Sequence, residues 1–205
     1  MSIMNADALL AIMRERRSIR RYVSRAVPRA VLERLLEAAR WAPSAHNRQP
    51  WRFAVLTDAE RQAALAEAMG ARFRADLLAE GVGTAEVEAQ LARSYARLTE
   101  APALIVLFVD TTAMATYAEA RRQQGEYIMA VQSVALAAQN LLLAAHAEGL
   151  GACWIAAPLF APEEVRAALG VPQDWVAQGL IALGYPAERP TRTREPIEAK
   201  TRWYT

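Results

Sequence analysis

Apolar residues in the first half of the chain recur every three or four positions, which predicts amphipathic helices. Pro28 suits the first turn of one helix, and Asp58 suits the cap of another. Gly81-Val82-Gly83 interrupts the pattern, and Pro102 stops it. The helices expected from this spacing cover residues 6–15, 28–39, 59–69, 71–80 and 84–99.

Four shorter apolar runs have the length of β-strands. The run 104–109 is apolar at every position, which indicates a strand covered on both faces. The other runs are 53–56, 152–156 and 176–183. Pro162 begins a short amphipathic helix, whereas the proline-rich tail from Tyr185 onward is expected to lie extended over a surface.

The longest predicted element is a helix from about Gln123 to Glu148, which has no charged residue between Glu126 and Glu148. A stretch of this length raises the question of a membrane span. Five polar side chains at seven-residue spacing argue instead for a helix buried in the protein centre or at a subunit interface, where one polar stripe is paired internally. They are Gln132, Ser133, Gln139, Asn140 and His146.

The composition is that of a soluble protein, with 54 % hydrophobic and 22 % charged residues and a net charge of +2. A chain of 205 residues fits one domain over residues 1–205 with a sizeable core. The single cysteine excludes an internal disulfide and a cysteine-based zinc cluster, and the two distant histidines offer no metal-ligand spacing. The N-terminus carries no secretion signal, so we expect a cytoplasmic protein without a membrane partner.

One candidate for chemistry is the stretch 40–53, which places two prolines, two tryptophans and short polar side chains between a helix and a strand. Each proline favours extended geometry in the residue before it, so the link is expected to be ordered and extended. Ser44, Asn47 and Gln49 offer uncharged hydrogen-bonding groups that suit a neutral heterocycle. A rigid connector with capping residues would use the same side chains.

A second candidate is the arginine-rich stretch 14–25. Guanidinium forks match phosphate oxygens in bidentate geometry, and the Ser18 hydroxyl adds a donor. Taken alone, such a cluster is more often a solvated basic face, and it also suits nucleic acid. The nearly balanced net charge argues against a dedicated nucleic-acid binder.

Together the two stretches resemble the signature of the nitroreductase family of FMN enzymes. The resemblance lies in Arg16-Arg17-Ser18-x-Arg20 followed by Pro43-Ser44-x-x-Asn47-x-Gln49-Pro50-Trp51, and it runs from about residue 14 to residue 194. The segments 44–53, 129–135 and 140–154 further resemble one branch of the family. That branch is the flavin domain at the C-terminal end of the bifunctional enzyme that matures the deazaflavin coenzyme F(420).

The resemblance implies an FMN site built from three segments. The positions that match the grip on the phosphate, ribityl chain and pyrimidine edge are Arg16, Arg17, Ser18, Ile19, Arg20, Arg192 and Arg194. The loop that reaches the flavin, usually from the partner subunit, carries Pro43, Ser44, Asn47 and Gln49. The strand end beside the ring is Trp154, Ile155, Ala156 and Ala157, where a backbone N–H would donate to the reactive flavin nitrogen. Ala156 and Ala157 replace the acidic residue and glycine of many relatives.

Three further residues have weaker signals. Cys153 lies in an apolar strand and is expected to be inert packing. His46 is expected to be structural. Asp76 follows Arg72 and Arg74 in a segment that resembles the mouth of the flavin pocket, so it is a candidate substrate contact, with an exposed, charge-paired helix as the alternative.

The resemblance therefore implies an α+β fold, with a three-layer core, a mixed, mainly antiparallel sheet and an intertwined homodimer. The chemistry would be centred on the flavin, with NAD(P)H as a donor and neither a protein nucleophile nor a metal. The expected reaction is reduction of a dehydro-precursor of coenzyme F(420). The alternatives are a broad NAD(P)H-dependent nitroreductase or quinone reductase and, from another class, a basic nucleic-acid-binding module.

Overall fold

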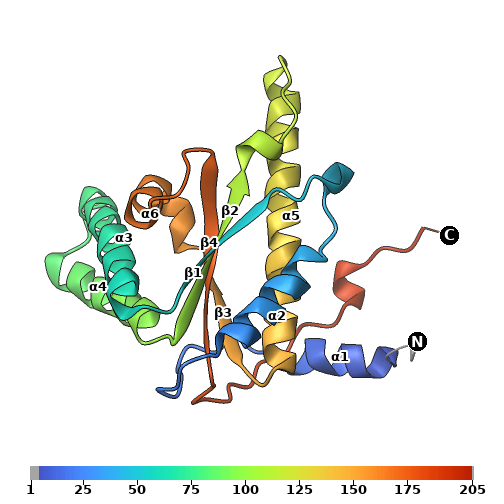
Figure 1. Cartoon of the computed structure of the whole chain (residues 1–205), viewed down its shortest axis with the longest axis horizontal. Coiled ribbons are helices and arrows are strands. Elements are labelled where there is room, and N and C mark those ends of the chain that lie inside the picture. The colour runs from blue at the N-terminus through green and yellow to red at the C-terminus, as the bar shows by residue number, and fades with distance from the viewer. Residues whose placement is uncertain (1–4, 205) are drawn as a thin grey trace.

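The structure, a computed structural model, describes residues 5–204. Its strands form one sheet in the order β1-β2-β4-β3, and neighbouring strands run antiparallel. Helices cover both faces of this sheet (Figure 1), which confirms the predicted α+β core of three layers. The strands are β1 (Trp51–Leu56), β2 (Ala103–Asp110), β3 (Gly151–Ile155) and β4 (Trp175–Gly184).

The sheet is less mixed than predicted. Within residues 5–204, the parallel pairing is a single bridge between Ser18 and Ala152 at the β3 edge. The central strand β2 is buried at every position, as its apolar run predicts. Alternate β2 side chains enter two separate cores, because successive residues of a strand point to opposite faces.

The helices divide between the two faces of the sheet (Figure 1). One face carries α2 (Arg29–Arg40) and α5 (Ala120–Ala147), which share a core with Ile105 and Leu107 of β2. The other carries α3 (Ala59–Ala79), α4 (Thr84–Thr99) and α6 (Pro162–Leu169), next to Leu104 and Val106. The short α1 (Ala6–Glu15) lies by the C-terminal end of α5.

Most of the helix ends predicted from local sequence signals agree with the structure. The Asp58 carboxylate accepts a hydrogen bond from the Arg61 N–H at 2.9 Å and caps α3. Gly81 has a left-handed φ of 78° and separates α3 from α4. The predicted gap at Gly70 is wrong, since α3 continues through it. One glycine inside a helix costs only about 1 kcal/mol, less than α3 gains by packing along α4.

The long helix α5 is apolar enough to span a membrane by length and composition alone. However, 44 % of its most apolar window is buried within the protein, and it packs against α2 and the sheet. It is therefore a core helix, in agreement with the prediction. It begins at Ala120, one turn earlier than its apolar pattern indicated.

The polar positions of α5 do not form one internally paired stripe, and that prediction is wrong. The Ser133 hydroxyl donates to the Met129 carbonyl oxygen at 2.8 Å. The Asn140 side chain donates to a carbonyl oxygen of α2 at 3.2 Å. Gln132 and Gln139 are exposed instead, because neighbouring positions on a helix point about 100° apart.

The tail after β4 is extended, as predicted, apart from a single turn at η4 (Glu198–Lys200). It is tied to the segment after α1 by backbone hydrogen bonds from Val23 N–H to the Tyr185 oxygen at 2.8 Å and from Ala187 N–H to the Arg21 oxygen at 2.9 Å. Figure 1 shows the tail passing the lower end of α5. Lys200, the only lysine of the chain, pairs with Glu195.

Candidate functional site

The segment after α1 places its arginines beside the β3 edge of the sheet. The Ile19 N–H donates to the Ala152 oxygen at 3.1 Å, and Ser18 bridges the same residue. Gly151 makes this approach possible, because a Cβ there would lie 2.6 Å from Ile19 Cγ2. Residues 16–20 are therefore held in register with the strand that leads to Ile155.

Arg16, Arg17 and Arg194 form a cluster of positive charge. Burial, the nearby Arg194 guanidinium and then Arg17 lower the pKa of Arg16. None of the three joins an ion pair in the part of the chain that the structure describes. The Arg17 Nε is buried without a hydrogen-bond partner among residues 5–204. Like charges gathered in this way are suited to a bound anion.

Glu188 fixes the tail that brings Arg194 to this cluster. Its carboxylate accepts the Arg20 N–H at 2.7 Å and pairs with the Arg21 guanidinium at 3.0 Å. The Arg20 N–H and the Arg21 side chain hold the pKa of Glu188 below its ordinary value. The tie is therefore present above the ordinary carboxyl pKa and is lost as the pH falls through the lowered value. Arg192 and the Arg20 side chain are exposed.

Replacement of Glu188 by alanine is expected to loosen the tail. Tryptic cleavage at Arg192 and Arg194 should accelerate about threefold, because the lost hydrogen bonds are partly exposed and each is worth about 1 kcal/mol. Time-resolved mass spectrometry of the digest measures the rate. Glu198→Ala, which removes a tail carboxylate away from both cleavage sites, is the control, and equal acceleration in both variants would contradict a specific tie at Glu188.

The link between α2 and β1 is ordered but not extended, which corrects the prediction. It contains a 3-10 turn, η1 (Ala45–Asn47), and left-handed φ values of 53° at His46, 53° at Asn47 and 51° at Gln49. The backbone N–H of Gln49 donates to the Ser44 hydroxyl oxygen at 3.0 Å, and the side-chain amide nitrogen of Gln49 donates to the Asn47 side-chain oxygen at 3.2 Å. Pro43, Asn47 and Gln49 are exposed. The loop thus presents amide groups outward from a fixed backbone.

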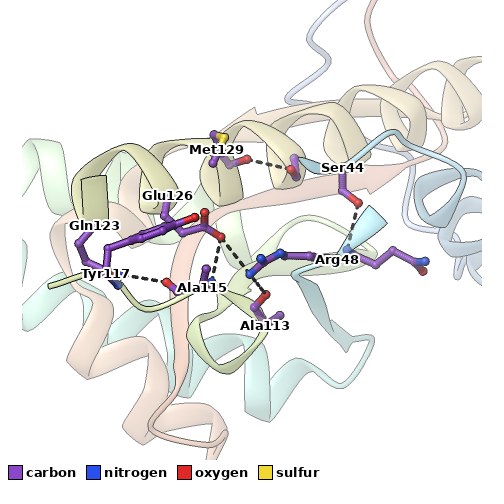
Figure 2. Close-up of polar contacts among 10 residues, drawn as sticks. Ser44, Arg48, Ala113, Ala115, Tyr117, Gln123, Glu126 and Met129 are labelled. Atoms are coloured by element: carbon purple, nitrogen blue, oxygen red, sulfur yellow. Dashed lines mark hydrogen bonds and ion pairs between the residues drawn. The ribbon is translucent and has the colours of Figure 1, made fainter. Parts of the chain in front are cut away.

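Arg48 of this loop and Arg52 of β1 reach carboxylates that sequence reasoning missed. Figure 2 shows Arg48 directed at Glu126 of α5, with a nitrogen–oxygen distance of 3.2 Å. Arg52 pairs with Asp110 at the end of β2 at 2.6 Å. Both partners lie far away in the sequence and are single acidic residues without a motif. The one available signal for Glu126 was its place as the last charged residue before the long uncharged stretch of α5.

The predicted strand end lines a cavity of about 1040 Å³. Ile155 and Ala157 contribute to its wall, and Trp154 and Ala156 are half-buried beside them. Asp76 of α3 lines the same cavity, so the structure brings this predicted substrate contact to the predicted flavin strand. Its carboxylate is paired with Arg72 at 3.0 Å. Apolar side chains from α3, α4 and the 3-10 turn η3 (Ala157–Phe160) share the rest of the wall with Glu80, Arg93 and Arg97.

Arg74 does not join this group. It faces Glu88 of α4, with one nitrogen–oxygen distance of 3.0 Å, in a different pocket. Arg72, Arg74 and Asp76 therefore do not act on the cavity as one group, since i and i+2 positions of a helix do not share a face. Cys153 is buried and free, in agreement with its predicted role in packing. His46 is exposed within the loop turn.

Within one chain, the loop and the arginine cluster lie toward opposite ends of α5. Arg48 is anchored at Glu126, near the start of the helix, whereas Ser18 and Ile19 meet the strand that follows its end. These points are about 30 Å apart along the helix, at a rise of about 1.5 Å per residue. In Figure 1 the loop after α2 lies beside the upper half of α5, and the tail passes the lower end of that helix. One chain therefore does not bring the two predicted half-sites together.

The comparison with known families decides the class of the protein. The sequence profile of the Nitroreductase family matches residues 13–185. The chain belongs to the Nitroreductase family. The chain is 36 % identical to a protein of Thermus thermophilus named NADH dehydrogenase, over 96 % of each chain. It is 32 % identical to the 5,6-dimethylbenzimidazole synthase of Rhodospirillum rubrum, over 89 % of this chain and 83 % of that one.

Solved structures show the same relationship. A nitroreductase from Desulfovibrio desulfuricans, crystallised in complex with FMN, superposes on this chain with a TM-score of 0.74. The two are 27 % identical, and the match covers 99 % of each chain. The family-level prediction is thereby confirmed, and the chain is an oxidoreductase of an FMN-dependent family. The finer resemblance to the F(420) maturation enzyme stays a prediction.

Proposed function

We propose that this protein binds FMN and transfers electrons from NAD(P)H to a small acceptor in the cavity beside Ile155 and Ala157. The observation that carries the proposal is the cluster of Arg16, Arg17 and Arg194, which lacks a carboxylate within the described residues and includes a buried unpartnered Nε. A phosphate dianion supplies the missing charge and accepts guanidinium donors. The relative crystallised with FMN supports this assignment.

The rest of the predicted set fits the other parts of FMN. Ser18, Ile19, Arg20 and Arg192 would complete the grip on the phosphate and ribityl chain, and Ser44, Asn47 and Gln49 would hydrogen-bond the polar ring edge. The backbone at Ala156 and Ala157 would face the reactive nitrogen, and positive charge near the ring would favour its reduced, anionic form. Bound FMN supplies two-electron redox chemistry, while the protein binds, orients and excludes water.

We propose that the chain works as a cytoplasmic homodimer, with each site shared between two subunits. The separation of the loop from the arginine cluster along α5 supports this proposal. So do the apolar side chains left exposed on α1, α5 and the tail, which are Leu9, Leu10, Met13, Ile128, Leu136, Ile197 and Trp203. A second copy would cover these faces.

Light scattering should accordingly give twice the mass of the 22.6 kDa chain at micromolar concentration. The physical reason is the apolar surface that one subunit leaves uncovered. Dilution until the mass halves should also release the flavin, because each half-site would lose its complement. A monomer that keeps bound FMN would contradict the shared site.

For the acceptor, we propose a flat heteroaromatic compound, with an unsaturated precursor of coenzyme F(420) as the first candidate. Asp76 and Arg72 support it, because they place charged groups in the cavity wall that a small neutral nitroaromatic would not need. The second candidate is a broad nitroaromatic or quinone acceptor, which the relatives named NADH dehydrogenase and NAD(P)H nitroreductase favour.

The purified protein is expected to be yellow, with FMN released on denaturation. A colourless protein that takes up no added FMN would contradict the proposal. NADH and NADPH are then tested, without oxygen, for reduction of the flavin, which lowers its visible absorbance. Each acceptor is next tested for reoxidation of the reduced flavin, which restores that absorbance. The precursor is expected to restore the band faster than nitroaromatics, and Asp76→Ala should raise the KM for the precursor without releasing FMN. Faster return with nitroaromatics would favour the second candidate.

A further inference from the structure

Two buried carboxylates flank the loop that carries Ser44, Asn47 and Gln49. Glu126 Oε1 pairs with Arg48 at 3.2 Å and also accepts the Ala115 N–H at 2.9 Å. On the other side, Asp110 pairs with Arg52, whose guanidinium donates to the Gln49 oxygen at 3.2 Å. Figure 2 shows that Glu126, a residue of α5, contacts both Arg48 of the loop and Ala115 in the segment that precedes α5.

The loop conformation needs such support because its backbone is strained. His46, Asn47 and Gln49 all adopt left-handed φ values, which side-chain-bearing residues rarely do. Three of them within four positions persist only when surrounding contacts fix the backbone. Arg48, the remaining residue of this stretch, is the one whose side chain reaches a buried charge.

Glu126 is costly to bury for stability alone. Its side chain is 3 % exposed against 32 % for Arg48, and its Oε2 has no hydrogen-bond partner among residues 5–204. Replacing a buried ion pair by uncharged groups of similar size is often neutral or stabilising. A pair kept under these conditions is better explained by the geometry that it imposes on the loop.

We propose that Glu126 is a positioning residue for FMN binding, which acts through Arg48 and does not touch the cofactor. It holds the strained 44–49 backbone so that the side chains of Ser44, Asn47 and Gln49 point at the flavin. The inference rests on the proposed FMN function. It goes further by assigning a role to a residue on another element that matches none of the family motif positions quoted above.

The test compares FMN binding with folding in the full-length apoprotein. The double variant Arg48→Met with Glu126→Gln removes both charges but keeps a side-chain oxygen for the Ala115 N–H. Its dissociation constant for FMN should rise about tenfold or more, because a small misplacement of binding groups has large effects. The visible circular dichroism of the bound flavin should change, and the apoprotein melting temperature should not fall. The matched control is Arg34→Met with Glu148→Gln, the ion pair between α2 and the end of α5, which should bind like the wild type.

A folded double variant with an FMN affinity within about twofold of wild type and an unchanged dichroism band would overturn the proposal. If the double variant does not fold, Glu126→Asp decides instead. It keeps the negative charge on a side chain that is one methylene shorter, so the carboxylate lies farther from Arg48. Weaker FMN binding with altered dichroism is expected, and unchanged binding overturns the proposal. A wild-type protein that binds no FMN would defeat the proposed function itself, which is a distinct outcome.

Discussion

Replacement of Arg16 and Arg194 by alanine is expected to lower FMN affinity about 100-fold or more while the apoprotein stays folded. A hydrogen bond from a charged group is worth about 1.5–3 kcal/mol, and each 1.4 kcal/mol is about tenfold in affinity. The folded apoprotein should tolerate the change, because neither side chain is in an ion pair among the described residues. Burial and then the neighbouring arginines already disfavour the charge of Arg16. Fluorescence titration with FMN measures the affinity.

Riboflavin makes this experiment specific, because it has the same ring and ribityl chain without the phosphate. Wild-type protein should prefer FMN strongly, and the double variant should bind the two ligands almost equally. Arg61→Ala on α3, an exposed arginine outside the cluster, is the matched control. If the variant keeps its preference for FMN, these arginines do not hold the phosphate.

Gly179→Ala is expected to destabilise the protein by about 2–3 kcal/mol, at the upper end of the usual cost of overpacking. A Cβ at Gly179 would overlap the Trp154 ring, at its Cζ2 atom. The ring cannot easily give way, because it packs against the buried core and lies on the strand that leads to the cavity. Urea denaturation of the apoprotein measures the loss.

A second substitution separates this clash from a general effect of alanine in a strand. Trp154→Phe removes the indole atoms that the new Cβ would meet, so adding it to Gly179→Ala should recover part of the lost stability. The double-mutant cycle then gives a coupling of about 1 kcal/mol or more, as expected for residues in contact. Additive effects would show that the ring and the glycine do not constrain each other.

Local patterns were sufficient for most of the fold. The four strands, the cap at Asp58 and the break at Gly81 follow from residues close in sequence, and the structure places them as expected. Helix α3 departs from its pattern because packing against α4 outweighs the weak preference at Gly70. The prediction of one internally paired polar stripe on α5 failed for another reason. Equal spacing of polar residues does not reveal which of two helix faces meets the core.

The candidate site divides in the same way. Arg16, Arg17 and Ile155, which the family motif assigns to the FMN site, lie near the same edge strand, and their role in binding FMN stays a prediction. The left-handed backbone at Asn47 and its anchor at Glu126 were not predictable, because both depend on contacts that close only in the folded chain. Proline neighbours favoured an extended link, but hydrogen bonds and ion pairs across the loop outweigh that local preference.

The abundance of arginine has a practical consequence for the tail. Guanidinium groups stay protonated in proteins and do not compete for amine-directed labels, so Lys200 is the only side-chain amine in the sequence. It is more than half exposed and lies a few residues beyond Arg194. A dye coupled there would sit on the segment that closes the arginine cluster. The chain therefore carries a natural attachment point from which tail docking can be timed by fluorescence.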